Sequence, residues 1–244
     1  MRPVYSSSTM SYSNSPFVSY TKLSPNCTKN RTHAIDTITI HCVVGQVTVE
    51  RLGEIFARPE RQASSNYGIG YDGKIGLYVP ESSRSWCSSS ASNDHRAVTC
   101  EVASDTYHPY AVTDAAYESL ILLVTDICKR NGIKKLVWSE NKSDRINHRN
   151  GCNMTVHRDF AKKECPGEWL YSRHAEIAAR VNEKLGALPE GVRWLTIEHN
   201  GKKKELKASL IADENYIRLR DIQDVLQLGT VGYNSTTKTP TLKT

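Results

Sequence analysis

The sequence lacks paired cysteines, long apolar runs and an apolar N-terminal signal, and each absence excludes a class of protein. It has seven cysteines, an odd number, and no two of them are spaced as C-x-x-C. These absences argue against a disulfide framework and a zinc knuckle, so we expect most of the cysteines to be buried thiols. No apolar run approaches the ~18 residues of a membrane span. The first residues, MRPVYSSSTMSYSNS, contain no apolar stretch typical of secretory signals, so we expect synthesis in a cytoplasm without a signal peptide.

Length and charge favour a globular protein whose partner, if it has one, is anionic. The chain has 244 residues, of which 39% are apolar, enough for one sizeable core and an appendage. The net charge of +6 favours an acidic polymer as partner, although a basic surface without a partner explains the charge at least as well. Lys and Arg are dispersed, with one run at 202–204, so we do not expect a nucleic-acid binder.

A short apolar run, ITIHCVV at residues 38–44, predicts a strand. Side chains alternate between the two faces of a strand, so His41 lies on the face opposite the isoleucines and Cys42. We therefore do not expect His41 and Cys42 to bind one metal ion. A second strand at 97–103 places Glu101 on the face opposite its valines and Cys100.

The remaining periodic segments alternate between strands and helices. They predict a helix at 49–57, a hairpin at 67–79 around Asp72-Gly73, a helix from Thr113 or Asp114 to Asn131-Gly132, a strand at 135–138 and a helix at about 170–185 closed by Gly186. Polar loops are predicted at 80–96 and at 139–154. In the first loop Trp86 and His95 are candidates for substrate contact, and Trp86 could equally fill the rim of the core. This order of elements predicts an α/β fold with a central mixed sheet flanked by helices.

The stretch TVHRDFAKKECPG, residues 155–167, contains candidate metal ligands. Catalytic zinc takes three protein ligands and leaves a fourth position for water, and His157 and Cys165 with one distant histidine would supply three. The spacing of His157 and Cys165 suits a loop that folds back better than one helix face. Spacing alone does not exclude two other pairs, His148 with Cys152 and His33 with Cys42, and most histidines are core or surface residues.

Four motifs in one order carry a resemblance to a known family. They are TITIHC, SSNYGIGYDGKI, DHRAVTCEVASD and GCNMTVHRDFAKKECPG. In this order they resemble the type-2 N-acetylmuramoyl-L-alanine amidases, a family that includes phage endolysins, bacterial wall amidases and peptidoglycan-recognition proteins. The resemblance extends over about residues 16–186 and implies the amidase fold for this segment.

The resemblance implies a role for each matching residue. His41, His157 and Cys165 match the three ligands of a catalytic Zn²⁺. Lys163 matches a lysine that stabilises charge on the scissile carbonyl, and Glu101 matches the general base of one branch.

Other interpretations of these residues remain open. A second branch uses a tyrosine before the Asp-Gly turn, where this chain has Ser65, so we expect Glu101 to be the base. Lys163 could instead be a solvated lysine like Lys162, and Glu101 could pair with an arginine. Arg158 and Asp159 could orient His157 or pair with each other.

The implied activity is hydrolysis of the amide bond between N-acetylmuramic acid and L-alanine in peptidoglycan. An endolysin-like protein of this kind acts on the bacterial cell wall after release, with neither a nucleic acid nor a membrane as partner. The alternative is a non-catalytic peptidoglycan-binding module. Relatives that only recognise peptidoglycan lack the cysteine ligand, so Cys165 favours the enzyme.

Residues 191–244 predict a small α+β segment of another kind. They comprise a hairpin around Asn200-Gly201, a helix through Leu219, Ile222, Val225 and Leu226, and a last polar strand. The phrases ENYIRLRDIQDVLQLG and TKTPTL resemble the wall repeat found at the N-terminus of copper amine oxidases and on Gram-positive surface proteins. The resemblance implies wall binding or self-association into a homo-oligomer, and a plain stabilising subdomain fits as well.

The predicted organisation therefore has three parts. These are a flexible N-terminal arm at 1–15, a zinc amidase catalytic domain at 16–186 and a small wall-binding or self-association domain at 191–244.

Overall fold

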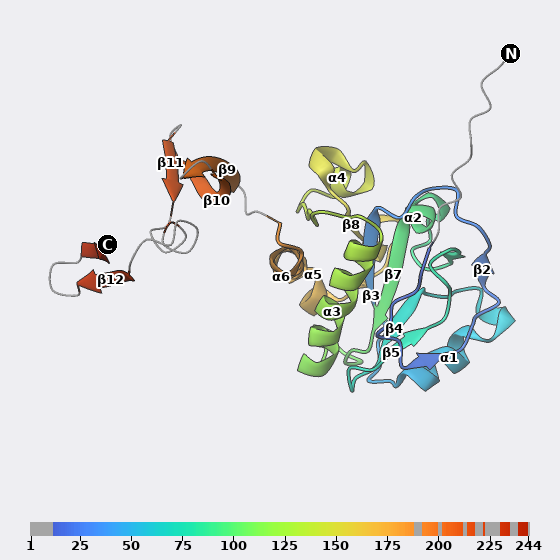
Figure 1. Cartoon of the computed structure of the whole chain (residues 1–244). Helices are drawn as coiled ribbons and strands as arrows, with labels where there is room; N and C mark the ends of the chain where they lie inside the picture. Colours follow the sequence, from blue (N-terminus) through green and yellow to red (C-terminus); the bar gives the residue numbers. More distant parts are fainter. Residues whose placement is uncertain are drawn as a thin grey trace, which may run out of the picture. The chain divides into compact units, whose positions relative to one another are not determined.

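The computed structural model describes residues 12–187, 192–199, 202–211, 214–217, 222, 230–234 and 239–243. The chain divides into two compact units after Ala187. The first unit contains a central sheet with helices on both faces (Figure 1). In the ranges given, no helix has the length and apolar character needed to cross a membrane.

Six strands form the central sheet in the order β1-β5-β4-β7-β3-β8. Only β4 and β5 pair antiparallel, and the other neighbours are parallel. The strands are β1 Tyr20–Thr21, β3 Thr37–Cys42, β4 Tyr67–Ile69, β5 Ile75–Leu77, β7 Ala97–Val102 and β8 Met154–Val156. This architecture confirms the predicted α/β fold with a central mixed sheet.

Six α-helices and three 3₁₀ turns surround the sheet within the first unit's described residues. The helices are α1 Val49–Phe56, α2 Ala91–Arg96, α3 Asp114–Arg130, α4 Lys142–Ile146, α5 Glu168–Tyr171 and α6 His174–Leu185. The turns are η1 Pro59–Arg61, η2 Arg149–Gly151 and η3 His157–Asp159, and β2 Cys27–Thr28 pairs with β6 Arg84–Ser85.

Helix α3 covers one face of the sheet, as Figure 1 shows, and forms the main core with α6 and the sheet's isoleucines. Its side chains Leu120, Ile121 and Val124 are fully buried. The helix begins where predicted, because the hydroxyl of Thr113 accepts a hydrogen bond from Ala116 N at 3.1 Å. It ends at Arg130, and Gly132 follows with a φ of +73°.

Helix α1 packs on the opposite face, where strand glycines leave room for it. Leu52 and Phe56 pack against Tyr78. A Cβ at Gly68 would lie 2.6 Å from Tyr78 Cε2 and 2.8 Å from Leu52 Cδ1, so only glycine fits at this strand position. Gly68 pairs in register with Glu101. Glu101 therefore lies on this face of the sheet.

The strand predicted at 135–138 is wrong, because these residues have no regular structure. Most of their backbone groups bond to side-chain amides, and one backbone bond, from Asn153 N to Val137 O at 3.1 Å, reaches the residue before β8. Leu136 N donates to Asn182 Oδ1 at 2.7 Å, and Val137 N donates to Asn153 Oδ1 at 2.8 Å. The segment is therefore held without joining the sheet.

Other boundaries also differ from the prediction. The loop predicted at 80–96 contains β6 and helix α2, whose N-cap is Ser90. The loop predicted at 139–154 contains α4, whose N-cap is Asn141, and ends at β8. The last helix is interrupted between α5 and α6, and its end at Gly186 is confirmed. Strand β3 stops at Cys42, and Val44 has the left-handed φ of 60°.

The second unit contains a three-stranded sheet in the order β11-β10-β9 and the pair β12-β13. The strands are β9 Val192–His199, β10 Lys202–Ile211, β11 Glu214–Ile217, β12 Thr230–Asn234 and β13 Thr239–Lys243. His199 pairs with Lys202 across Asn200-Gly201, which confirms the predicted hairpin. Leu206 and Ala208 are buried, while Glu205 and Lys207 are exposed, so the hairpin has one covered face.

Two predictions fall mainly on residues that the structure does not describe. Of the helix predicted through Leu219, Ile222, Val225 and Leu226, only Ile222 is described. Of the arm predicted at 1–15, residues 1–11 lie outside the described ranges, and Ser15 donates its N–H to Tyr67 Oη at 2.8 Å. The three functional domains remain predictions.

Replacing Gly68 with alanine should destabilise the protein, because its Cβ would overlap Tyr78 and Leu52. Overpacking of this kind costs ~1–3 kcal/mol, which urea unfolding followed by circular dichroism measures. Gly45→Ala is the matched control, since its nearest contact is an ordinary 3.4 Å from Val47 Cγ1. Equal stability of the two variants would contradict the packing of α1 on this face.

Candidate metal centre

The parallel strands bring the predicted site residues to one end of the sheet. His41 in β3 pairs in register with Glu101 in β7. Strand β8 pairs with β3, and its last residue, Val156, lies opposite Ile40. His157 follows Val156 as His41 follows Ile40, so the backbones of the two histidines lie side by side. Residues at the carboxyl ends of neighbouring parallel strands meet at one edge, where α/β folds usually bind ligands.

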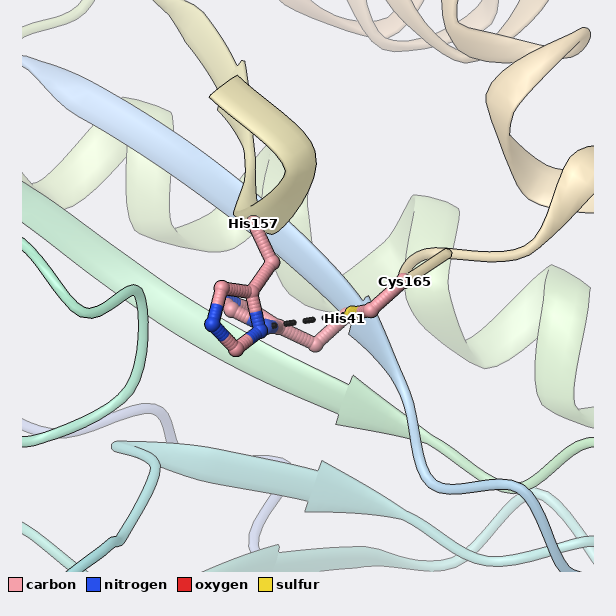
Figure 2. Close-up of side chains that lie close together, drawn as sticks. All are labelled: His41, His157 and Cys165. Carbon is pink, nitrogen blue, oxygen red and sulfur yellow. Dashed lines mark hydrogen bonds between the residues drawn. The ribbon is translucent and has the colours of Figure 1, made fainter. Parts of the chain in front are cut away.

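His41, His157 and Cys165 converge at this edge. One donor atom from each lies within 4.8 Å of the other two. Cys165 Sγ is 3.3 Å from His41 Nδ1, and the two imidazole centroids are 5.1 Å apart. Figure 2 shows the three side chains approaching from β3, from the turn after β8 and from the loop that follows it. The structure therefore brings together the three predicted ligands.

The loop that carries Cys165 folds back on the turn that carries His157, as their spacing predicts. Arg158 N donates to Cys165 O at 3.2 Å. Asp159 is buried, accepts from Val156 N at 3.1 Å and forms an ion pair of 2.6 Å with the buried Arg145. The alternative that Arg158 and Asp159 pair with each other is wrong. The buried Arg145–Asp159 pair instead fixes the turn at His157.

Both histidines are held in the neutral form that a metal requires. Burial lowers the pKa of His41 well below its usual range, and burial with the charge of Lys163 lowers the pKa of His157. Ser89 Oγ lies 2.9 Å from His157 Nε2. A hydrogen bond at one ring nitrogen fixes the tautomer and leaves the other nitrogen for a metal. The sequence alone did not identify Ser89 as a partner of His157.

A buried network of polar side chains joins the elements around the centre. Thr39 and Thr155, two residues before His41 and His157, share a hydrogen bond of 2.8 Å. Asn93 donates to Thr39 Oγ1 at 3.1 Å and accepts from Thr155 at 2.9 Å. The network holds β3, β8 and α2 together. Strand alternation could have suggested the two threonines, but nothing local indicated Asn93.

Glu101 is suited to proton transfer. Its Oε2 is buried with no hydrogen-bond partner among the described residues, and Cys87 Sγ donates to Oε1 at 3.9 Å. Burial raises the pKa of Glu101 to about 8. The alternative role as an arginine's partner is not observed, since the described part of the chain gives Glu101 no ion pair.

Lys163 lines a pocket of about 440 Å³ beside the centre, together with His157, Cys87 and Trp86. The neighbouring Lys162 does not line this pocket. Trp86 lines this pocket, and its contact with substrate stays a prediction. His95 does not line the pocket, and its Nδ1 accepts from Thr32 N at 3.2 Å.

The competing histidine pairs do not gather a third ligand. His148 Nδ1 lies 3.1 Å from the backbone oxygen of Cys152, and His33 lies near Asp36. Within the described ranges, two groups of three metal-ligating side chains occur, and both include His41. Cys42 belongs to neither group.

The chain is similar to several solved structures at low sequence identity. A selenomethionyl derivative of AmpD is 19% identical, with a TM-score of 0.50, over 69% of this chain and 99% of that chain. The amidase LysC of Clostridium intestinale URNW is 19% identical over 70% of this chain and 96% of that chain, with a TM-score of 0.47. Drosophila peptidoglycan recognition protein SD is 14% identical over 60% and 84%, with a TM-score of 0.45.

Sequence comparison identifies the family. No curated protein matches the chain significantly. A family model described as N-acetylmuramoyl-L-alanine amidase matches residues 31–168, more than half of the 244 residues. The match covers β3, β7, β8 and all three predicted ligands, and it leaves the second unit outside. The chain therefore belongs to the N-acetylmuramoyl-L-alanine amidase family.

Proposed function

We propose that the protein is a zinc hydrolase that cleaves the amide bond between N-acetylmuramic acid and L-alanine in the peptidoglycan of bacterial cell walls. The observation that carries this proposal is the convergence of His41, His157 and Cys165, beside Glu101, in a member of the amidase family.

The three side chains fit zinc. Two neutral imidazoles and a thiolate, formed when Cys165 loses its proton to solvent, are a donor set that Zn²⁺ prefers, and three protein ligands leave one coordination position open. When bound, zinc lowers the pKa of water and polarises the substrate carbonyl. Asp159 fixes the turn that carries His157, and Ser89 lies beside the Nε2 atom of that histidine. Supporting hydrogen bonds of this kind keep the ligand oriented.

Two further residues take part in the reaction: Glu101 transfers protons, and Lys163 stabilises negative charge. Glu101 takes the proton of the attacking water and then delivers it to the leaving amine. Its raised pKa suits both steps, because a carboxyl group that titrates near neutral pH can accept and donate. The Lys163 ammonium, at the pocket wall, donates a hydrogen bond to the oxyanion that develops on the carbonyl.

A non-catalytic peptidoglycan-binding module is the second candidate function. It requires neither a cysteine ligand nor a carboxylate with a raised pKa beside it. Cys165 and Glu101 support the enzyme. For the second unit we propose wall attachment or self-association, which its resemblance to a wall repeat supports.

Purified protein, dialysed to remove loosely held metal, should retain a single zinc ion per chain. Cys165→Ser should lose it, because a hydroxyl is a poorer zinc ligand than a thiolate. Cys152→Ser is the matched control and should keep it, since this buried thiol lies outside the donor set. Inductively coupled plasma mass spectrometry gives the content. A protein that binds walls without retaining zinc would favour the recognition module.

Glu101→Gln should lower the hydrolysis of purified walls by ~10²–10⁴-fold, the usual contribution of general acid–base catalysis. Its zinc content should match that of the wild type. Cleavage is followed as new N-terminal alanine without new reducing sugar ends, which separates amide from glycan hydrolysis. The control, Glu54→Gln, changes an exposed carboxylate of α1. Full activity of Glu101→Gln would exclude the proton-transfer role, and wild-type protein that releases no alanine would contradict the proposed function.

Lys163→Met should lower kcat by ~10²–10³-fold with a smaller change in KM, because the lost hydrogen bond acts mainly in the transition state. Lys162→Met, one residue away and outside the pocket, should behave as the wild type. Steady-state kinetics on a soluble muropeptide measures both variants. If the two substitutions have equal effects, Lys163 is a solvated surface lysine.

A further inference from the structure

A second group of metal-ligating side chains shares His41 with the first. It consists of His41, Cys87 and Glu101, and one donor atom from each lies within 4.8 Å of the other two. Cys87 lies in the Ser-rich segment that follows β6. This segment supplies no ligand to the proposed zinc centre. His41 belongs to both groups.

The two ring nitrogens of His41 can serve the two groups separately. Nδ1 lies 3.3 Å from Cys165 Sγ, so it belongs to the first group. Nε2 is buried, and the described residues offer it no hydrogen-bond partner. Glu101 Oε2 is buried and unpartnered in the same way. Buried polar atoms normally have partners, so two such atoms in one cluster point to a missing third group.

The thiol of Cys87 determines which cation the cluster can bind. It lies 3.9 Å from Glu101 Oε1. A thiolate, a carboxylate and an imidazole nitrogen together select a borderline or soft divalent cation such as Zn²⁺ or Cd²⁺, and not Mg²⁺ or Ca²⁺. The same thiol lines the 440 Å³ pocket with His157 and Lys163. The pocket supplies an entry path to the cluster.

We propose that His41 Nε2, Cys87 Sγ and the Glu101 carboxylate form a second site for a thiophilic divalent cation, which inhibits the enzyme when occupied. The inhibition rests on the proposed function, because the cation would engage the carboxylate that serves as base. Binding would release to solvent the thiol proton of Cys87, the Nε2 proton of His41 and the proton that the Glu101 carboxyl group holds below its raised pKa. His41, as an imidazolate, would then hold one cation at each ring nitrogen.

Three features make this site weaker than the first. Burial raises the pKa of the Cys87 thiol, so its proton is costly to displace. Two cations on one imidazole repel each other. The positive charges of Arg61 and Lys163 also border the pocket. The second cation should therefore bind only when the metal exceeds one equivalent.

A cadmium titration of metal-free protein tests the proposal. Equilibrium dialysis counts the bound ions, and ultraviolet absorption from cadmium–thiolate bonds reports each cysteine that becomes a ligand. Wild type should bind two equivalents, with the thiolate absorption rising in two steps. Cys87→Ser should lose the second equivalent and the second step. Cys152→Ser is the matched thiol control and should bind two.

Glu101→Gln provides an independent variant should Cys87→Ser fold poorly, and it too should bind one equivalent. A wild type that binds one cadmium ion, or a Cys87→Ser variant that binds two, would overturn the proposal.

The activity readout separates this proposal from the proposed function. Zinc beyond one equivalent should reversibly inhibit wall hydrolysis by the wild type, and Cys87→Ser should lose this inhibition relative to its own activity at one equivalent. An enzyme that is active at one equivalent and insensitive to excess zinc would overturn only the inhibitory site. A protein that binds two cations yet never cleaves walls would contradict the proposed function and leave the second site standing.

Discussion

The parallel pairing of β3 with β7 and β8 is the constraint on which the site depends. It sets His41 beside Glu101 in register and ends β8 one residue before His157. Because paired residues point to the same face, this ladder decides which groups share the edge of the sheet. A shift of one residue would turn His41 into the apolar core and place Cys42 on the face that carries Glu101, so the register and the chemistry are coupled.

Buried polar side chains then fix the elements that the ladder brings together. Asn93 joins Thr39 and Thr155, and Arg145 joins the turn after β8 through Asp159. Buried networks whose members are all hydrogen-bonded are rigid, since opening one bond leaves another group unsatisfied. Rigid support keeps His41 and His157 at a separation that suits one metal ion, which loops alone would not maintain.

The sequence predicted the parts whose signals are local. Alternation assigned the faces of His41 and Glu101, and an apolar stripe with the Thr113 cap predicted α3. The segment at 135–138 was mistaken for a strand because its backbone partners, Asn153 and Asn182, are distant in sequence. Residue spacing could not decide which histidine and cysteine bind the metal. The resemblance to the amidase family favoured His157 and Cys165. The Ser-rich segment that carries Cys87 and Ser89 has no periodic pattern of apolar residues, so the sequence did not predict its conformation. It is ordered by the buried carboxylate of Asp94, which accepts from the N–H groups of Cys87 and Ser88.

X-ray absorption at the zinc edge tests the central claim most directly. The protein is loaded with a single equivalent of zinc and measured in solution. The expected first shell contains one sulfur at ~2.3 Å, two imidazole nitrogens at ~2.0 Å and one further light atom from solvent. A shell with no sulfur would contradict the assignment of Cys165, and a shell with two sulfurs would contradict the ligand set of His41, His157 and Cys165.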